Sequence, residues 1–179
     1  MTSFYPTLED RHDLVPVVVR TDYTDDSAWR DVSDELTSVG DALFIQGTQW
    51  SGVTVDEVLK AAVLYPALAV IFIADAQTWS ASGPSLIAVT TSTPDDEDYE
   101  HTISNGRQFR VLPHAVHEVH CGIEMLVRRF PDFAQSATAQ PGQVFAGTAS
   151  HPNASASRLA DGSERAADRS GGRRLGHWP

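Results

Sequence analysis

Two apolar segments constrain the fold of this chain more than any other feature of its sequence. Residues 15–20 (Val-Pro-Val-Val-Val-Arg) and 68–73 (Leu-Ala-Val-Ile-Phe-Ile) are almost unbroken runs of apolar, mostly β-branched side chains. Strands with one face in water alternate polar and apolar residues, whereas unbroken runs are typical of parallel strands buried on both faces. We therefore expect the two segments to pair in the middle of a sheet that helices cover on both faces.

The residues between the two segments predict a strand flanked by two helices. Asp25, Asp26 and Ser27 offer helix N-caps, and the residues after them carry apolar side chains at steps of three and four, the period of an amphipathic helix of about three turns that Gly40 ends. These side chains are Trp29, Val32, Leu36 and Val39. Residues 41–46 predict a short strand. The next helix is expected to begin at Thr54-Val55-Asp56-Glu57, which matches a capping box.

The second half of the domain predicts two further strands, 86–90 and 108–112, and two helices, near 114–127 and after Pro131. Residues 144–147 predict a last segment docked on the domain. The connection 76–85 is short for a crossover helix, so an antiparallel return of the fourth strand stays open. The pattern predicts an α/β layered domain with a mostly parallel five-stranded sheet flanked by helices, which is mixed if the fourth strand returns antiparallel.

Composition divides the chain into three parts. Residues 1–11 are a polar lead-in, residues 12–147 form the single α/β domain, and residues 148–179 form a tail rich in Ser, Ala, Gly and Arg. The large apolar side chains of the tail are Leu159, Leu175 and Trp178. So little apolar surface does not offset the entropy of ordering a segment, and we expect the tail to be disordered.

The charge of the chain restricts its partners. The net charge is −11, and residues 1–147 alone carry 8 basic and 21 acidic side chains. Such a surface repels phosphate groups, which disfavours binding to nucleic acids and to anionic membranes. The acidity can serve solubility alone, and its functional interpretation is a basic protein partner or a cation.

Three further features predict a cytoplasmic protein. The chain begins without the basic and apolar regions of a secretory leader. Its longest apolar run, 66–74, is far shorter than a membrane span. Cys121 is the single cysteine, so no internal disulfide can form.

Four aspartates at predicted strand ends are the first candidate site. Asp22, Asp25 and Asp26 follow the first strand, and Asp75 follows the third. Ligands of open parallel sheets bind beyond the carboxyl ends of the strands, where gathered carboxylates could hold Mg²⁺. Phosphoacceptor receiver domains have such a site but need a lysine after the fifth strand, and the single lysine here is Lys60 in the second helix. The simpler interpretation is that the aspartates cap helices and form turns.

The predicted helix 114–127 carries the second candidate site. His117, Cys121 and Glu124 share one face of this helix and are competent zinc ligands. Neither His-Glu-x-x-His nor a Cys-x-x-Cys pair is present. The alternative interpretation is that the histidines of this helix, His114, His117 and His120, form a polar outer face, while Val116 and Val119 belong to its core stripe.

Two tryptophans in predicted loops are the third candidate. Trp50 and Trp79 both lie beside small polar residues. A loop tryptophan either fills a gap at the edge of the core or anchors an interface, and the first interpretation is favoured here.

Several segments together resemble a known family. Residues 20–29 have the pattern Arg-Thr-Asp-x-x-Asp-Asp-x-x-Trp, and further matching segments lie at 54–59, 71–75, 109–113 and 130–134. Over about residues 14–147 the chain resembles a family of small actinobacterial domains known only as uncharacterised. That family has an asparagine-rich stretch where this chain has residues 120–129. The resemblance implies the boundary of the domain and no activity.

Two functional hypotheses follow. The leading one is a non-enzymatic interaction or regulatory module whose acidic surface meets a protein partner. The alternative is a Mg- or Zn-dependent enzyme or metal-binding domain that uses the strand-end carboxylates. No Gly-x-Ser-x-Gly, phosphate-binding loop or Gly-x-Gly-x-x-Gly occurs, so no organic cofactor is expected. The sequence does not indicate an oligomeric state.

Overall fold

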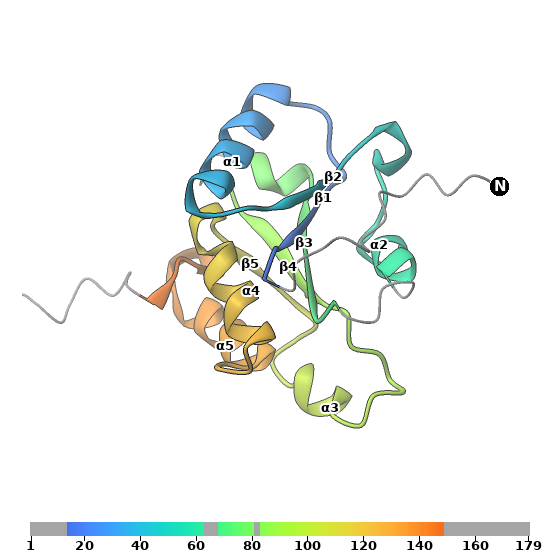
Figure 1. Cartoon of the computed structure of the whole chain (residues 1–179), viewed down its shortest axis with the longest axis vertical. Helices are drawn as coiled ribbons and strands as arrows, with labels where there is room; N and C mark the ends of the chain where they lie inside the picture. Colours follow the sequence, from blue (N-terminus) through green and yellow to red (C-terminus); the bar gives the residue numbers. More distant parts are fainter. Residues whose placement is uncertain (1–13, 63–67, 81–82, 149–179) are drawn as a thin grey trace, which may run out of the picture. The chain divides into compact units, whose positions relative to one another are not determined.

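A computed structural model describes residues 14–62, 68–80 and 83–148. The chain divides into a compact unit that ends at Gly147 and a second unit that begins at Thr148. The predicted lead-in, 1–11, and the tail, apart from Thr148, lie outside the described residues. The first unit contains a six-stranded sheet with the order β2-β1-β3-β4-β5-β6 (Figure 1). Its strands are β1 (Val17–Arg20), β2 (Leu43–Ile45), β3 (Val70–Ala74), β4 (Leu86–Thr90), β5 (Gln108–Val111) and β6 (Val144–Phe145).

The two apolar segments pair in the middle of the sheet, as their sequences predict. β1 and β3 are parallel neighbours, with Val18 opposite Phe72. β2 lies on the other side of β1 and is also parallel to it, with Val18 opposite Phe44. Every residue of β1 and β3 is buried. The α/β fold expected from the sequence is therefore confirmed.

The sheet is mixed because the chain returns antiparallel at β4. The described part of the connection after β3 contains only a short 3-10 turn, η3 (Ala76–Trp79), and β4 pairs antiparallel with β3. β5 is antiparallel to β4, so it runs in the direction of β3. The carboxyl ends of β1, β2, β3 and β5 therefore lie at one edge, together with the start of β4. We call this the strand-end edge; it includes residues 20–22, 46–47, 75, 85 and 110–112.

The sheet has one strand more than predicted. Residues 144–145, expected only to dock on the domain, pair in parallel with β5, where Arg110 lies opposite Val144. The segment escaped prediction as a strand because its regular part is two residues long, too short to show a period.

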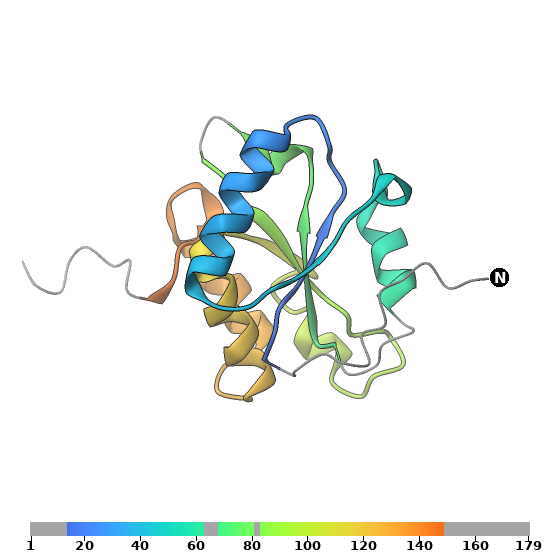
Figure 2. The same cartoon turned by 45° about the horizontal axis from the view of Figure 1, so that its top comes forward.

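Helices cover both faces of the sheet (Figures 1 and 2). α1 (Asp26–Val39), α4 (Val116–Glu124) and α5 (Phe130–Ala139) pack on the face that presents Val18 and Phe72. α2 (Val55–Ala62) packs on the opposite face, which presents Val17 and Val19. The alternation of neighbouring valines between the two cores is the period-2 geometry of a strand. No helix within the described ranges is long and apolar enough to cross a membrane.

The predicted N-cap of α1 and the predicted capping box of α2 are both present. The Asp25 carboxylate accepts hydrogen bonds from the backbone N–H groups of Ser27 and Ala28 at 2.9 Å each, and Gly40 ends α1. In the capping box of α2, the backbone N–H of Thr54 donates to Glu57 Oε2 at 2.9 Å, and the Glu57 N–H donates to Thr54 Oγ1 at 3.4 Å.

Three local predictions were wrong. Val39 is 51% exposed, because the last turn of α1 extends past the core. The predicted helix 114–127 starts as a 3-10 turn, η4 (Pro113–Ala115), and α4 then ends at Glu124, which leaves residues 125–127 in an exposed turn. His120, assigned to a polar outer face, is fully buried against Phe72. The acidic segment 91–106 contains the short helix α3 (Tyr99–Thr102).

Candidate functional site

The strand-end edge gathers polar residues from strands that are far apart in the sequence. Because β1 and β3 are parallel, the residues that follow Arg20 and Ala74 lie side by side. The backbone N–H groups of Thr21 and Asp22 both donate to the carbonyl of Ala74, at 2.8 and 3.3 Å. Asp22 and Asp75, the acids that follow the two strands, are therefore held at the same edge.

Asp75 is held by an arginine that reaches across β4. Arg110 Nη1 donates to Asp75 Oδ1 at 2.8 Å, and Nη2 donates to Oδ2 at 2.7 Å. Nη1 also donates to the carbonyl of Ser85 at 3.0 Å. The same carboxylate accepts the Thr78 N–H at 3.1 Å and so caps η3. Burial raises the pKa of Asp75, but the hydrogen bonds and charge of Arg110, aided by Thr78, lower it below its ordinary value.

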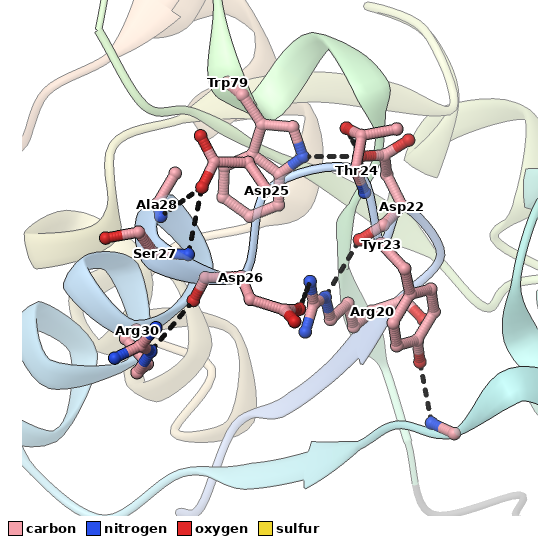
Figure 3. A network of polar contacts seen from close by, with 11 residues as sticks. Arg20, Asp22, Tyr23, Thr24, Asp25, Asp26, Ser27, Ala28, Arg30 and Trp79 are labelled. Atoms are coloured by element: carbon pink, nitrogen blue, oxygen red, sulfur yellow. Dashed lines mark hydrogen bonds and ion pairs between the residues drawn. The ribbon is translucent and has the colours of Figure 1, made fainter.

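Arg20 is the buried cation of this edge, with 5% of its surface exposed (Figure 3). Its Nη2 donates to Asp26 Oδ1 at 2.6 Å, and its Nε donates to the carbonyl of Asp22 at 2.9 Å. The guanidinium also lies 4.3 Å from the centre of the Tyr23 ring and 5.3 Å from that of Trp29. Cation–π contacts and charge-assisted hydrogen bonds together compensate for taking this charge out of water.

Asp22 and Tyr23 connect the end of β1 to its neighbours. Asp22 Oδ1 accepts the indole N–H of Trp79 at 2.8 Å and the backbone N–H of Thr24 at 3.1 Å (Figure 3). Burial raises the pKa of Asp22, and its hydrogen bonds with Thr24 and Trp79 bring the pKa below the ordinary value. The Tyr23 hydroxyl donates to the carbonyl of Arg20 at 3.1 Å and accepts the backbone N–H of Gly47 at 2.7 Å.

The four aspartates proposed as magnesium ligands each contact different partners. Asp25 caps α1, Asp26 pairs with Arg20, Asp22 accepts from Trp79, and Asp75 pairs with Arg110. Within the described ranges, no three His, Cys, Asp or Glu side chains are arranged to hold a metal ion. The geometry therefore supports the capping and turn interpretation and gives the metal hypothesis no support.

The helix α4 does not bring its proposed zinc ligands to one point. His117 Nε2 lies 3.1 Å from the carbonyl of Asp41, so this ring is directed at the start of the β2 segment. Cys121 is half-buried and carries a free thiol. Within the part of the chain that the structure describes, these two side chains and Glu124 do not form a group that could hold a metal ion.

The two tryptophans have different environments. Trp50 is 6% exposed and belongs to the core beneath α2, as the interpretation of a gap-filling side chain predicts. Trp79 is half-buried and packs edge-on against Trp29, with ring centres 6.4 Å apart. Part of Trp79 stays accessible and forms one wall of a cleft.

This cleft lies between α1 and η3 and has a volume of about 230 Å³. We call it the α1–η3 cleft. It is lined by Asp25, Ala28, Asp31, Val32, Glu35, Thr78, Trp79, Ser80 and Pro84. Residues 28, 31, 32 and 35 form one face of α1, so a single helix supplies both apolar and acidic lining groups. Glu35 Oε1 also lies 3.1 Å from His114 Nδ1.

Sequence reasoning missed Asp31 and Glu35. Their spacing of four places them on the same helix face, but the sequence of α1 has acids on several of its faces. This face differs from the rest of the helix because Trp79 and Pro84, from a distant part of the chain, pack beside it and form the cleft.

Comparison with known families agrees with this fold boundary, because a family model matches residues 15–148, most of the chain. The chain belongs to the DUF6924 family, a domain of unknown function. The matched range begins just before β1 and ends just after β6, so the family unit is the whole six-stranded domain. No curated protein and no solved structure matched the chain.

Proposed function

We propose that this domain is a non-enzymatic binding module whose α1–η3 cleft receives a basic side chain of a protein partner. The observation that carries the proposal is the lining of the cleft. Three acids, Asp25, Asp31 and Glu35, stand beside an apolar floor, and the described lining residues include no lysine or arginine.

The chemistry of the lining favours arginine or lysine over an inorganic cation. These side chains have a long aliphatic stem and a charged end, and they bury the stem while the charge stays near water or an acid. In the cleft, Ala28 and Pro84 are accessible to the stem, beside the buried Val32, and Asp31 is accessible to the charge, together with Glu35, which also contacts His114. The accessible face of Trp79 adds a surface on which a guanidinium can stack.

The contacts of the strand-end edge support a binding role. Its charged groups bind one another: Arg20 pairs with Asp26 and Arg110 pairs with Asp75. The carboxylates of this edge pair with arginines and cap α1 and η3. These contacts keep α1 and η3, the two walls of the cleft, in place. The acidity of residues 1–147 would also attract a basic partner at long range and repel anionic ones.

The experiment is a titration of the full chain with the peptide acetyl-Gly-Leu-Arg-Leu-Gly-amide. The same peptide with citrulline in place of arginine is the control, since it keeps the shape and loses the charge. Binding is followed through the indole N–H signal of Trp79 in ¹⁵N–¹H spectra. We expect the arginine peptide alone to shift this signal.

Two charge variants of α1 assign the binding to the cleft. Asp31→Lys/Glu35→Lys reverses two lining charges and is expected to weaken binding at least about tenfold, because it removes the carboxylates that would pair with the arginine of the peptide. Asp34→Lys changes the charge of the same helix at an exposed residue outside the cleft and should weaken binding about twofold at most, through long-range attraction alone. Equal binding of the arginine and citrulline peptides, or equal loss in the two variants, would refute the proposal.

A further inference from the structure

Three consecutive apolar side chains are exposed in the turn between α4 and α5. Met125 is 61% exposed, Leu126 90% and Val127 77%. Single exposed apolar residues are ordinary, but a run of three is unusual on a monomeric soluble domain and marks an interaction surface. Arg129, at the start of α5, is also exposed. We call residues 125–129 the apolar turn.

The apolar turn is held in one conformation by its own backbone. The N–H groups of Met125, Val127 and Arg128 donate to the carbonyls of Cys121 and Gly122, at 2.9, 3.0 and 3.0 Å. Leu126 has φ 54°, in the left-handed region that a leucine seldom adopts. The backbone hydrogen bonds therefore hold Leu126 in an unfavourable conformation, although its side chain contributes almost nothing to the core. Such strain without a benefit to stability indicates that the leucine serves in binding.

Close packing of the two helices supports the turn from below. A Cβ on Gly122 would approach Phe133 Cζ to 2.7 Å, so any other residue at this position would require the Phe133 ring to move. The Arg128 guanidinium lies 4.3 Å from the centre of the Phe133 ring and donates to the Asp132 carbonyl at 3.0 Å and to Ser136 Oγ. Arg128 is thus part of the support, which leaves Arg129 as the exposed cation beside the apolar side chains.

We propose that the apolar turn of one molecule docks in the α1–η3 cleft of a second copy of this chain. The inference rests on the proposed function and names its partner. The turn offers aliphatic side chains next to an exposed arginine, and the cleft offers an apolar floor next to Asp31 and Glu35. The exposed arginine and the aliphatic side chains of the turn are locally complementary to the acids and the apolar floor of the cleft, and repulsion between two copies that are both acidic overall keeps the association weak.

The two surfaces lie at opposite ends of the domain, so a molecule cannot fill its own cleft. The cleft lies at the strand-end edge, beside η3. α4 starts at that edge, after β5, and runs back along the sheet, which carries the turn to the other end (Figures 1 and 2). Docking is therefore head-to-tail, with a different surface from each copy. One turn in a cleft of about 230 Å³ makes a small interface, and we expect a weak, concentration-dependent association.

The test uses the full chain and two interface variants. Sedimentation velocity from about 20 to about 500 µM should show the mean mass of the wild type rising with concentration, as a small transient interface predicts. The turn variant Leu126→Asp/Arg129→Glu and the cleft variant Asp31→Lys/Glu35→Lys should each remain monomeric. Both variants change exposed or partly exposed groups, and thermal unfolding checks that they fold.

Mixing the two variants gives the decisive result. The cleft variant keeps an intact turn and the turn variant keeps an intact cleft, so their mixture should form a 1:1 dimer and nothing larger. Asp34→Lys is the charge control and should associate like the wild type. A monomeric mixture, or association that survives in the turn variant alone, overturns the inference. If the wild type is monomeric throughout while the arginine peptide still binds the cleft, the second-copy partner is wrong and the proposed function stands.

Discussion

Asp75 and Arg110 form a two-point ion pair across β4, with both carboxylate oxygens accepting from separate guanidinium nitrogens at 2.8 and 2.7 Å. The pair joins the end of β3 to β5, although these strands do not touch in the sheet. Because the same carboxylate caps η3, the contact determines where the chain leaves β3 and hence where one wall of the α1–η3 cleft lies.

Replacing Arg110 should destabilise the domain. Arg110→Met keeps the aliphatic stem but leaves the Asp75 charge without its main partner, and we expect a loss of about 2 kcal/mol in the free energy of unfolding. Arg107→Met is the matched control, because Arg107 is exposed and lies 3.9 Å from Asp56. It should cost less than about 0.5 kcal/mol. Urea unfolding of both variants measures the difference, and equal losses would contradict the structural role of the ion pair.

The same pair makes stability depend on pH in the acidic range. The pKa of Asp75 is lower in the folded protein than in the unfolded chain, so its contribution is present above the unfolded pKa of about 3.9 and disappears as the pH falls through the folded pKa. Asp75→Asn lacks this titration. The difference in unfolding free energy between wild type and Asp75→Asn should therefore shrink from pH 6 towards pH 3. A constant difference would show that Asp75 does not contribute through its charge.

The conformation of Leu126 predicts an unusual response to glycine. Glycine adopts a positive φ without strain, whereas alanine retains the strain, and Leu126 buries almost no surface. We expect Leu126→Gly to be more stable than Leu126→Ala by about 1 kcal/mol, after allowance for the greater unfolded-state entropy of glycine. Both variants should lose self-association, because both lack the leucine side chain. A Leu126→Gly variant that associates like the wild type would exclude this residue from the interface.

His120 should behave as a core residue. Its ring is fully buried, with the centre 6.5 Å from that of Phe72. His120→Ala leaves a cavity between α4 and the sheet and should cost about 2 to 4 kcal/mol in thermal or urea unfolding. His101→Ala, on the exposed face of α3, should cost less than about 0.5 kcal/mol. Equal effects of the two substitutions would contradict the burial of His120.

Elements with local sequence patterns could be predicted before the fold was known. The unbroken apolar runs of β1 and β3, the caps Asp25 and Thr54, and the terminator Gly40 specify their own structure within a few residues, through side-chain period and backbone capping. Four features could be seen only in the folded domain: the direction of β4, the two-residue strand β6, the burial of His120 and the lining of the α1–η3 cleft. Each depends on which distant segment packs beside it: Trp79 beside α1, β5 beside residues 144–145, Phe72 beneath His120. No local pattern encodes such a neighbour, because the energy of the contact arises only when both segments leave water together.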